Sequence, residues 1–359
     1  MKNSLTFAAA VLLCACSEGA RQPADSFTIK GRVNLPDGYV AGLVIHTDTA
    51  YSVSICEDAD ISNGQFTMTG QVDKPYQGTL MTNNLRLVEQ NQWPTDSIRW
   101  TYSEVFLSNG LLLFTLNDPS GPEPKGQLTG TQVQTDYHEW LAESNGSADG
   151  HPAWAFIDSH PESVVSVWLA NQLTDRAYHL TAEQTAHLEQ AIKQCPADTA
   201  RFNLFKRKLE ATKKTVKNAP LVDLELTDVE GTVCRLTDVV PRHGKYVLID
   251  FWASWCGICI HSMPDIAQLA NDYQDVFEVI GVSIDTKPEA WHKAMQKHPE
   301  PWPQYCTTQT GYQDLFDKYQ VGNGVPYYLL LSPEGRVLLS PEGPDEVREF
   351  LEETKNTKQ

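Results

Sequence analysis

The sequence predicts an α/β domain in the C-terminal part of the chain, with a central sheet covered by helices on both faces. A small all-β domain and a helical segment precede it. Three patterns support this order: residues 26–120 alternate short strands with turns, residues 131–217 carry apolar side chains at helical spacing, and residues 218–359 alternate apolar strands with helices. At about 150 residues a domain, a chain of 359 residues has room for two or three such units.

The N-terminal residues predict export from the cytosol. An apolar run from Leu5 to Ala15 follows Lys2, and it is shorter than the about 20 residues that a membrane-spanning helix needs. We therefore expect a signal peptide over residues 1–15. The Leu13-Cys14-Ala15-Cys16 sequence resembles a bacterial lipobox, which implies lipidation of Cys16 and a tether over residues 16–25. The alternative is an ordinary signal peptide with incidental cysteines.

Charge and hydropathy narrow the classes of partner. The chain carries 46 acidic and 28 basic residues, a formal net charge of −18, and such a surface repels nucleic acid. The basic stretch from Lys206 to Lys217 is interpreted as a solvated helix face. No later apolar stretch reaches transmembrane length. We expect a lipid-anchored envelope protein that faces the periplasm, where disulfide chemistry is available, and no nucleic-acid partner.

The N-terminal half contains structural signals and no catalytic constellation. Asn63-Gly64, followed by alternation from Gln65 to Thr69, predicts a β-hairpin. One strand is expected over residues 104–116, before a stretch rich in proline and glycine ends the β-domain near Asp118. In the helical segment, Thr181 and Gln184 predict a capping box.

The C-terminal region alternates strand and helix patterns. Residues 246–251 and 277–284 are nearly continuous apolar runs, typical of central strands covered on both faces. Between them one helix stripe recurs every three or four residues, namely Cys259, Met263, Ile266, Leu269 and Tyr273. Further helices are expected over 289–297, 311–319 and 345–354, and a hairpin of 326–331 with 336–339.

Two cysteines fall at the turn from the first central strand into this helix. The unpaired N–H groups and the dipole at a helix N-terminus favour a thiolate at Cys256. Cys259 follows one helical turn later, close enough to form a disulfide with Cys256 and to resolve a mixed disulfide. The pair therefore predicts thiol-disulfide exchange.

Metal and haem chemistry fit this pair of cysteines less well. Haem attachment requires a histidine directly after the second cysteine, whereas Ile260 stands there and His261 comes one position later. A zinc site requires two further ligands, and Cys306, His261 and His298 belong to no second paired motif. We expect neither a metal nor a cofactor.

The motifs resemble known redox proteins. WCGIC within DFWASWCGIC, with Pro264 in the helix and Gly324-Val325-Pro326 before a strand, resembles the thioredoxin fold. GVSIDTKPEAWHKAM resembles the TlpA/ResA branch of membrane-tethered thiol-disulfide oxidoreductases. The N-terminal stretch is similar to the domain of unknown function that precedes such modules in envelope lipoproteins of the Bacteroides type.

The resemblance implies roles for several residues. Pro326 matches the family's cis-proline, Val325 would pair its backbone with an extended substrate, and Trp255 would contact that substrate. Asp250 matches the buried acid of thioredoxin, which would relay the proton of Cys259. The alternative for Asp250 is a structural acid paired with a lysine or a water. The implied partners are protein thiols and disulfides and a membrane electron donor of the thiol-disulfide type, with the protein acting as a reductase.

Two departures from the family and two rival functions leave the client and the direction of electron flow open. Relatives in cytochrome c maturation carry glutamate where this chain has Ser262, and the Gly257-Ile258 pair differs from the Gly-Pro of thioredoxin. That pair tunes the reduction potential within about −270 to −120 mV. A peroxiredoxin-like peroxide reductase is one alternative. The other is a partner-binding envelope lipoprotein whose redox domain serves one client. Cys56, Cys195, Cys234 and Cys306 are expected to be buried thiols and not a disulfide framework.

Overall fold

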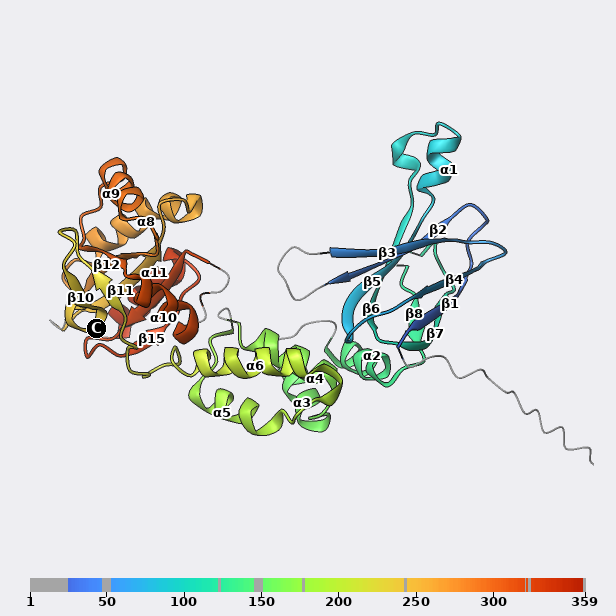
Figure 1. Ribbon diagram of the computed structural model, residues 1–359, viewed down its shortest axis with the longest axis horizontal. Coiled ribbons are helices and arrows are strands. Elements are labelled where there is room, and N and C mark those ends of the chain that lie inside the picture. The colour runs from blue at the N-terminus through green and yellow to red at the C-terminus, as the bar shows by residue number, and fades with distance from the viewer. Residues whose placement is uncertain are drawn as a thin grey trace, which may run out of the picture. The chain divides into compact units, whose positions relative to one another are not determined.

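The computed structural model describes residues 25–46, 53–121, 124–144, 151–175, 178–241, 244–319, 321 and 324–357. The expected signal peptide and the lipidation site at Cys16 lie outside these residues, as does the expected tether apart from Asp25. The chain forms two compact units, Met1–Thr135 and Asp136–Gln359. Most of the helical segment therefore belongs to the same unit as the C-terminal α/β domain (Figure 1).

The first unit is a two-sheet β-structure. One sheet has the order β4-β1-β7-β8 and the other β3-β2-β5-β6. The strands are β1 (Phe27–Val33), β2 (Val40–His46), β3 (Val53–Asp60), β4 (Gln65–Gly70), β5 (Tyr76–Asn83), β6 (Trp100–Leu107), β7 (Gly110–Leu116) and β8 (Gln127–Thr129). Alternate side chains of both sheets, such as Ile29 of β1 and Leu43 of β2, form one buried core.

The expected hairpin at Asn63-Gly64 is only half right. Both residues have positive φ, and Ser62 and Gln65 exchange backbone hydrogen bonds of 2.9 and 3.0 Å, which makes a tight two-residue turn. The strands on either side, β3 and β4, nevertheless belong to different sheets. β4 pairs with β1 instead, and this pairing places Phe66 and Met68 in the shared core.

The single strand expected over residues 104–116 is two strands in different sheets. The chain changes sheet at Ser108-Asn109, where the Asn109 side chain accepts from Val72 N (3.1 Å) and donates to Val72 O (2.8 Å). β7 then runs parallel to β1. Beyond the stretch where we expected the strands to end, β8 adds to β7. The sequence analysis also did not predict two short elements, the helix α1 (Leu85–Gln90) and the 3-10 turn Thr95–Ser97.

Among the described residues, five α-helices follow the β-structure, and the first of them begins at the end of the first unit. They are α2 (Gln132–Ser144), α3 (His151–Ser159), α4 (Val164–Leu173), α5 (Ala182–Ala191) and α6 (Thr199–Thr212), with a 3-10 turn at Pro196–Asp198. The capping box of Thr181 and Gln184 is confirmed. Within the parts of the chain that the structure describes, no helix is both long and apolar enough to cross a membrane.

The C-terminal domain confirms the expected α/β fold. Its sheet has the order β10-β9-β13-β12-β11-β14-β15, in which β11, β12 and β13 are parallel. The strands are β9 (Glu225–Thr227), β10 (Val233–Arg235), β11 (Tyr246–Trp252), β12 (Phe277–Ser283), β13 (Gln304–Thr307), β14 (Tyr327–Leu331) and β15 (Val337–Leu339). The helices are α7 (Leu236–Val239), α8 (Gly257–Asp272), α9 (Pro288–Lys297), α10 (Gln309–Tyr319) and α11 (Pro344–Thr357).

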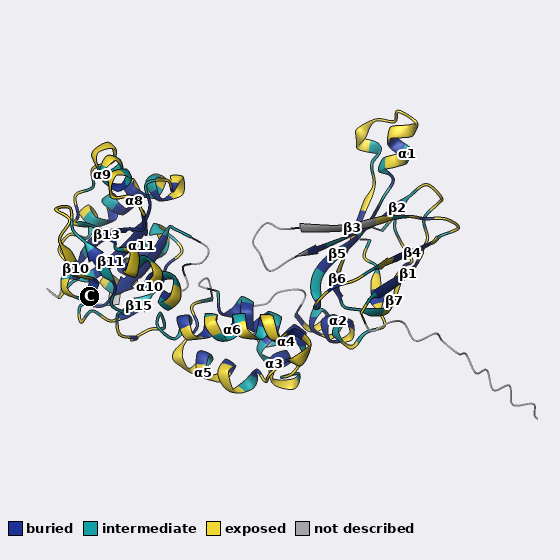
Figure 2. Ribbon diagram, viewed as in Figure 1, coloured by how far each residue is buried: buried dark blue, intermediate teal, exposed yellow. Residues whose placement is uncertain are grey.

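Helices cover both faces of this sheet. Leu248 of β11 packs with Ile266 of α8 and Val347 of α11 in one buried cluster. Its neighbour Ile249 packs with Leu315 of α10 in another. Figure 2 shows the central strands as buried and the outer sides of the helices as exposed. Because β11 is covered on both faces, any polar side chain in it is removed from water.

Helix α10 approaches strand β9 closely at a glycine. A Cβ atom at Gly311 would lie 1.9 Å from the backbone oxygen of Glu225 in β9. Thr308 ties the same two elements together, since its Oγ1 donates to Glu225 Oε1 at 2.7 Å and accepts from Gly311 N at 3.0 Å. A backbone atom held in a sheet cannot move aside for an added methyl group.

We therefore expect Gly311→Ala to lower the free energy of unfolding by about 1–3 kcal/mol, as overpacking does in other cores. Chemical denaturation followed by tryptophan fluorescence measures the change. Gly343→Ala is the matched control, because a Cβ atom there meets nothing within 4 Å, and its effect should stay within about 0.5 kcal/mol. Equal effects of the two substitutions would contradict this account of the α10 contact.

Candidate active site

The two cysteines lie where β11 passes into α8. Cys256 is the N-cap residue of α8 and forms a disulfide with Cys259, with a Cα–Cα distance of 5.3 Å. The Cys259 N–H points at Cys256 Sγ across 3.2 Å. The side chains next to the pair are open to solvent, since Trp255 is 66% and Ile258 71% exposed. The disulfide is thus buried at the base of an exposed apolar rim.

A second segment faces the disulfide. The Val325–Pro326 peptide bond is cis, as the resemblance implies. The carbonyl oxygen of Val325 lies 3.3 Å from Cys256 Sγ, and β14 begins at Tyr327. Val325 and Pro326 are half-buried, so part of this backbone lies at the surface beside the sulfur.

Asp250 is buried in the middle of the sheet. It lies on β11, only 1% exposed, on the face that carries Leu248 and α8. Burial, with a smaller contribution from the negative charge of Glu300, raises the pKa of Asp250 to about 8. In the described part of the chain, its Oδ1 has no hydrogen-bond partner and no lysine or arginine pairs with it. The interpretation of Asp250 as half of a lysine ion pair is therefore not supported.

Ser262, the position that departs from the family pattern, connects α8 to the sheet. Its Oγ lies 2.9 Å from the hydroxyl oxygen of Tyr328. Tyr328 is the register partner of Asp250 across β11 and β14, so the two side chains lie on the same face. A neutral hydrogen-bonded pair thus lies next to the buried acid.

Asp285 is a site residue that the sequence patterns did not single out. It follows β12 and is 4% exposed. Its carboxylate accepts hydrogen bonds from Ser254 N (2.8 Å), Ser254 Oγ (2.7 Å) and Ser283 Oγ (2.7 Å). Ser254 lies two residues before Cys256, so Asp285 fixes the turn that carries the reactive sulfur. The position of Asp285 directly after an apolar run could have indicated it, just as the position of Asp250 inside an apolar run indicated that acid.

The remaining cysteines are free thiols where the structure describes them. Cys195 and Cys306 are buried, as expected, whereas Cys234 is half-buried in a surface cleft. Burial raises the pKa of Cys306 to about 11, and its Sγ donates to Asp285 O at 3.3 Å. Cys56 belongs to β3, but its side chain lies outside the described part. Among the described residues no group of three or more His, Cys, Asp or Glu side chains is placed to hold a metal ion.

Comparisons with known proteins agree on one family. A family model described as thioredoxin-like matches residues 244–337. Thioredoxin 1 of Chlorobaculum tepidum is 38% identical over 55 residues, 15% of this chain and 54% of that protein. Thioredoxin of Chlorobaculum thiosulfatiphilum is 48% identical over 44 residues, 12% of this chain and 41% of that protein. The chain thus spans about half the length of these two relatives.

A longer match and a solved structure complete the comparison. The thioredoxin domain of a thiol-disulfide oxidoreductase from Bacteroides vulgatus is 27% identical, covers 39% of this chain and 97% of its own, and superposes with a TM-score of 0.33. The thiol:disulfide interchange protein HelX of Rhodobacter capsulatus is 30% identical over 128 residues, which cover 36% of this chain and 68% of HelX. This chain belongs to the thioredoxin-like family of thiol-disulfide oxidoreductases.

Proposed function

We propose that the protein exchanges disulfides with protein substrates outside the cytosol through Cys256 and Cys259, as a reductase held at a membrane by a lipid on Cys16. The observation that carries the exchange reaction is the disulfide at the N-terminus of α8, with a cis-proline segment 3.3 Å from its first sulfur. The anchor rests on the sequence around Cys16. The reductase direction and a membrane electron donor rest on the resemblance to tethered relatives.

Cys256 is the attacking sulfur in this proposal. In the reduced protein its thiolate gains the Cys259 N–H, now 3.2 Å from Sγ, and the positive end of the α8 dipole. An extended substrate segment pairs with the backbone at Val325 and contacts the exposed Trp255 and Ile258. The thiolate attacks a substrate sulfur, which gives a mixed disulfide and releases the other substrate sulfur as a thiolate.

Cys259 resolves the mixed disulfide and must lose its proton to do so. Its side chain is 1% exposed, so water has little access to it. Asp250 is the acid that we assign to accept this proton, because it is buried on the face that α8 covers and, within the described residues, no lysine or arginine pairs with its carboxylate. A carboxyl with a pKa of about 8 both takes up and releases a proton near neutral pH.

The two cysteines should fail in different ways. Cys256→Ser removes the nucleophile, so the reduction of insulin disulfides should stop. Cys259→Ser should leave the first attack intact and trap the substrate as a mixed disulfide, because no second thiol resolves it. Non-reducing gel electrophoresis with a disulfide substrate measures both outcomes. A trapped complex formed by Cys256→Ser and absent from Cys259→Ser would reverse the assignment.

The reduction potential of the pair tests the direction of electron flow. A reductase should have a potential near about −270 mV, whereas a value near about −120 mV would make the protein an oxidant. Equilibration with glutathione and thioredoxin as reference couples gives the value.

Metabolic labelling with a fatty acid, compared between the native chain and Cys16→Ser, tests the anchor. Label that persists in Cys16→Ser would contradict lipidation at Cys16.

Asp250→Asn should change both kinetics and stability. Loss of the proton acceptor should slow release of substrate from the mixed disulfide by about tenfold or more and abolish its pH dependence near 8. The pKa of Asp250 in the folded protein lies above the ordinary value of 3.8, so the folded protein holds this proton more tightly than the unfolded chain. The free energy of unfolding therefore has its full contribution from Asp250 below pH 3.8 and loses that contribution as the pH rises through about 8. Asp250→Asn should therefore raise the free energy of unfolding at pH 9 by about 2–5 kcal/mol. Unchanged stability at that pH would show that Asp250 is already ionised at lower pH.

Asp285→Asn tests whether the Ser254 turn sets the reactivity of Cys256. The amide places a donor where the carboxylate accepts from Ser254 and Ser283, so the turn should loosen. We expect kcat/KM for a disulfide substrate to fall by about tenfold, because misplaced reacting groups are costly, together with a shift of the reduction potential. Asp275→Asn, which removes an exposed charge, is the control. A lower stability with unchanged potential and kcat/KM would leave Asp285 a purely structural residue.

A further inference from the structure

The second cysteine of the pair is tied to the sheet by a chain of two hydrogen bonds. Ser262, one helical turn after Cys259 in α8, donates its hydroxyl hydrogen to the Cys259 carbonyl oxygen at 2.9 Å. The Oγ atom of Ser262 also lies 2.9 Å from the hydroxyl oxygen of Tyr328 in β14. We call the two bonds between Tyr328, Ser262 and Cys259 the hydroxyl link. It runs from a central strand of the sheet to the backbone of the resolving cysteine.

The directions of the two bonds follow from counting hydrogens. A carbonyl oxygen can only accept, so the bond to Cys259 uses the one hydroxyl hydrogen of Ser262. The bond between Ser262 and Tyr328 therefore takes its hydrogen from Tyr328. Hydrogen bonds that follow one another in this way strengthen each other. Loss of the Tyr328 hydroxyl should thus also weaken the bond from Ser262 to Cys259.

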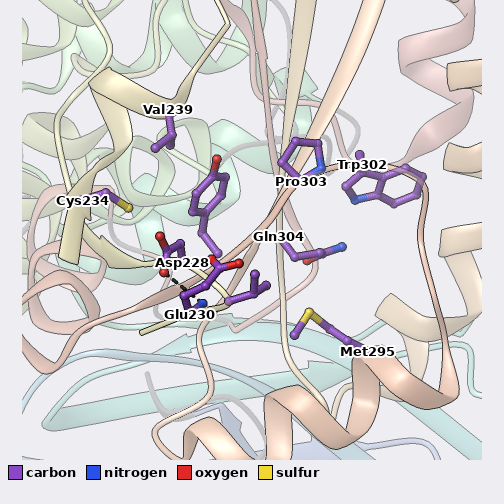
Figure 3. Close-up of a pocket in the computed structure, with 10 residues that line it drawn as sticks. Asp228, Glu230, Cys234, Val239, Met295, Trp302, Pro303 and Gln304 are labelled. Carbon is purple, nitrogen blue, oxygen red and sulfur yellow. Dashed lines mark hydrogen bonds between the residues drawn. The ribbon is translucent and has the colours of Figure 1, made fainter. Parts of the chain in front are cut away.

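Tyr328 is a fixed anchor for the hydroxyl link. Its side chain is 1% exposed and packs in one cluster with Ile266 of α8 and with Trp302. Ser340 Oγ donates to the Tyr328 carbonyl oxygen at 2.9 Å. Trp302 also lines a surface cleft of about 500 Å³, and Figure 3 shows it on the same side of that cleft as Pro303. Because Trp302 is only 7% exposed, it closes the cluster of Tyr328 off from the cleft.

The first turn of α8 has one backbone hydrogen bond fewer to the rest of the helix than a regular helix would have. Pro264 lies inside α8 and has no amide hydrogen, so the carbonyl oxygen of Ile260 loses the helical partner four residues later. Ser262 lies on the N-terminal side of Pro264, in the part of α8 that carries the two cysteines. The bond to Tyr328 therefore holds from outside a turn that the helix itself holds less firmly.

We propose that Tyr328 and Ser262 are positioning residues that hold Cys259 for its attack on the mixed disulfide and thereby lower the reduction potential of the pair. This inference rests on the proposed function, in which Cys259 resolves the mixed disulfide. In that step the Cys259 thiolate, whose proton Asp250 has taken, attacks the sulfur of Cys256. The Cys256–Cys259 bond forms, the bond from Cys256 to the substrate breaks, and the substrate sulfur leaves with the electron pair of that bond.

The hydroxyl link acts on this step through the position of the Cys259 backbone. In the mixed disulfide no bond joins the two cysteines, so the approach of Cys259 depends on how firmly the first turn of α8 is held. A held backbone raises the effective concentration of the thiolate at the neighbouring sulfur. The same restraint favours the disulfide over the dithiol, and a more stable disulfide has a lower reduction potential. The first attack uses Cys256, whose turn Asp285 holds through Ser254.

The test is Tyr328→Phe in the full chain, which removes only the hydroxyl group. We expect release of substrate from the mixed disulfide, measured in single turnovers, to slow by about three- to tenfold, the range that one hydrogen bond contributes. Formation of the mixed disulfide should keep its rate. The same factor on disulfide closure raises the reduction potential by about 15 to 30 mV. Ser262→Ala should give the same changes, and Ser262→Thr, which keeps a hydroxyl group, should restore the native values.

Two comparisons separate this role from a general loss of stability. Ser340→Ala removes another 2.9 Å bond to Tyr328, at its carbonyl oxygen and not at the hydroxyl that reaches α8. It should lower the free energy of unfolding and leave the reduction potential and the release rate at their native values. Tyr328→Phe combined with Ser262→Ala should have about the effect of Ser262→Ala alone, because both substitutions break one chain of hydrogen bonds.

A native reduction potential and a native release rate in Tyr328→Phe overturn the inference. Equal changes of both quantities in Ser340→Ala overturn it as well. Cys259→Ser keeps this failure apart from failure of the proposed function. If Cys259→Ser traps the substrate while Tyr328→Phe behaves as the native chain, the positioning role alone is rejected. If Cys259→Ser traps no substrate, the resolving role of Cys259 is rejected with it.

Discussion

One constraint on the C-terminal domain is the buried acid Asp250, which no lysine or arginine pairs with in the described part of the chain and which handles the proton of Cys259 in the proposed function. Asp250 lies on a strand covered on both faces, next to Tyr328 on one neighbouring strand and Gly281 on the other. Low polarity around the carboxyl favours its neutral form, and the charge of Glu300 acts in the same direction. Burial of an unpaired carboxyl costs stability. The cost is understandable where the group must gain and lose a proton near neutral pH.

The sulfur pair is held from two sides. On one side the Asp285 carboxylate fixes Ser254 in the turn before Cys256. On the other side the cis-proline segment brings the Val325 oxygen close to Cys256 Sγ. These supports come from the end of β12 and the start of β14, the two strands that flank β11. Reactive geometry on a short turn is thus maintained by the rigid sheet beneath it.

In the N-terminal unit, local sequence patterns predict a turn correctly but do not predict which strands pair. Asn63-Gly64 forms the turn that its residue types favour, because φ above zero is a property of single residues. The partner of the strand that follows is decided by a core shared between two sheets, so β4 pairs with β1 and not with β3. Because both sheets contribute to this shared core, residues 104–116 form two strands, β6 and β7, in different sheets. Neither choice is encoded within a few residues of the turn.

By itself the sequence determined the central strands β11 and β12, the helix between them, the dithiol at the N-terminus of that helix and the buried position of Asp250. These features are signalled by short-range patterns: apolar runs, a helical stripe, a two-residue cysteine spacing and an acid inside an apolar strand. The cis-proline came from the resemblance to the family, and the short elements β9, β10, α7 and β13 were not predicted. Only the tertiary structure decided what surrounds Asp250. Gln304 and Trp302 lie about 50 residues along the chain from Asp250, and only the parallel pairing of β11, β12 and β13 brings their segment to it. Such pairings form between distant segments that bury a common core, so no local pattern reports them.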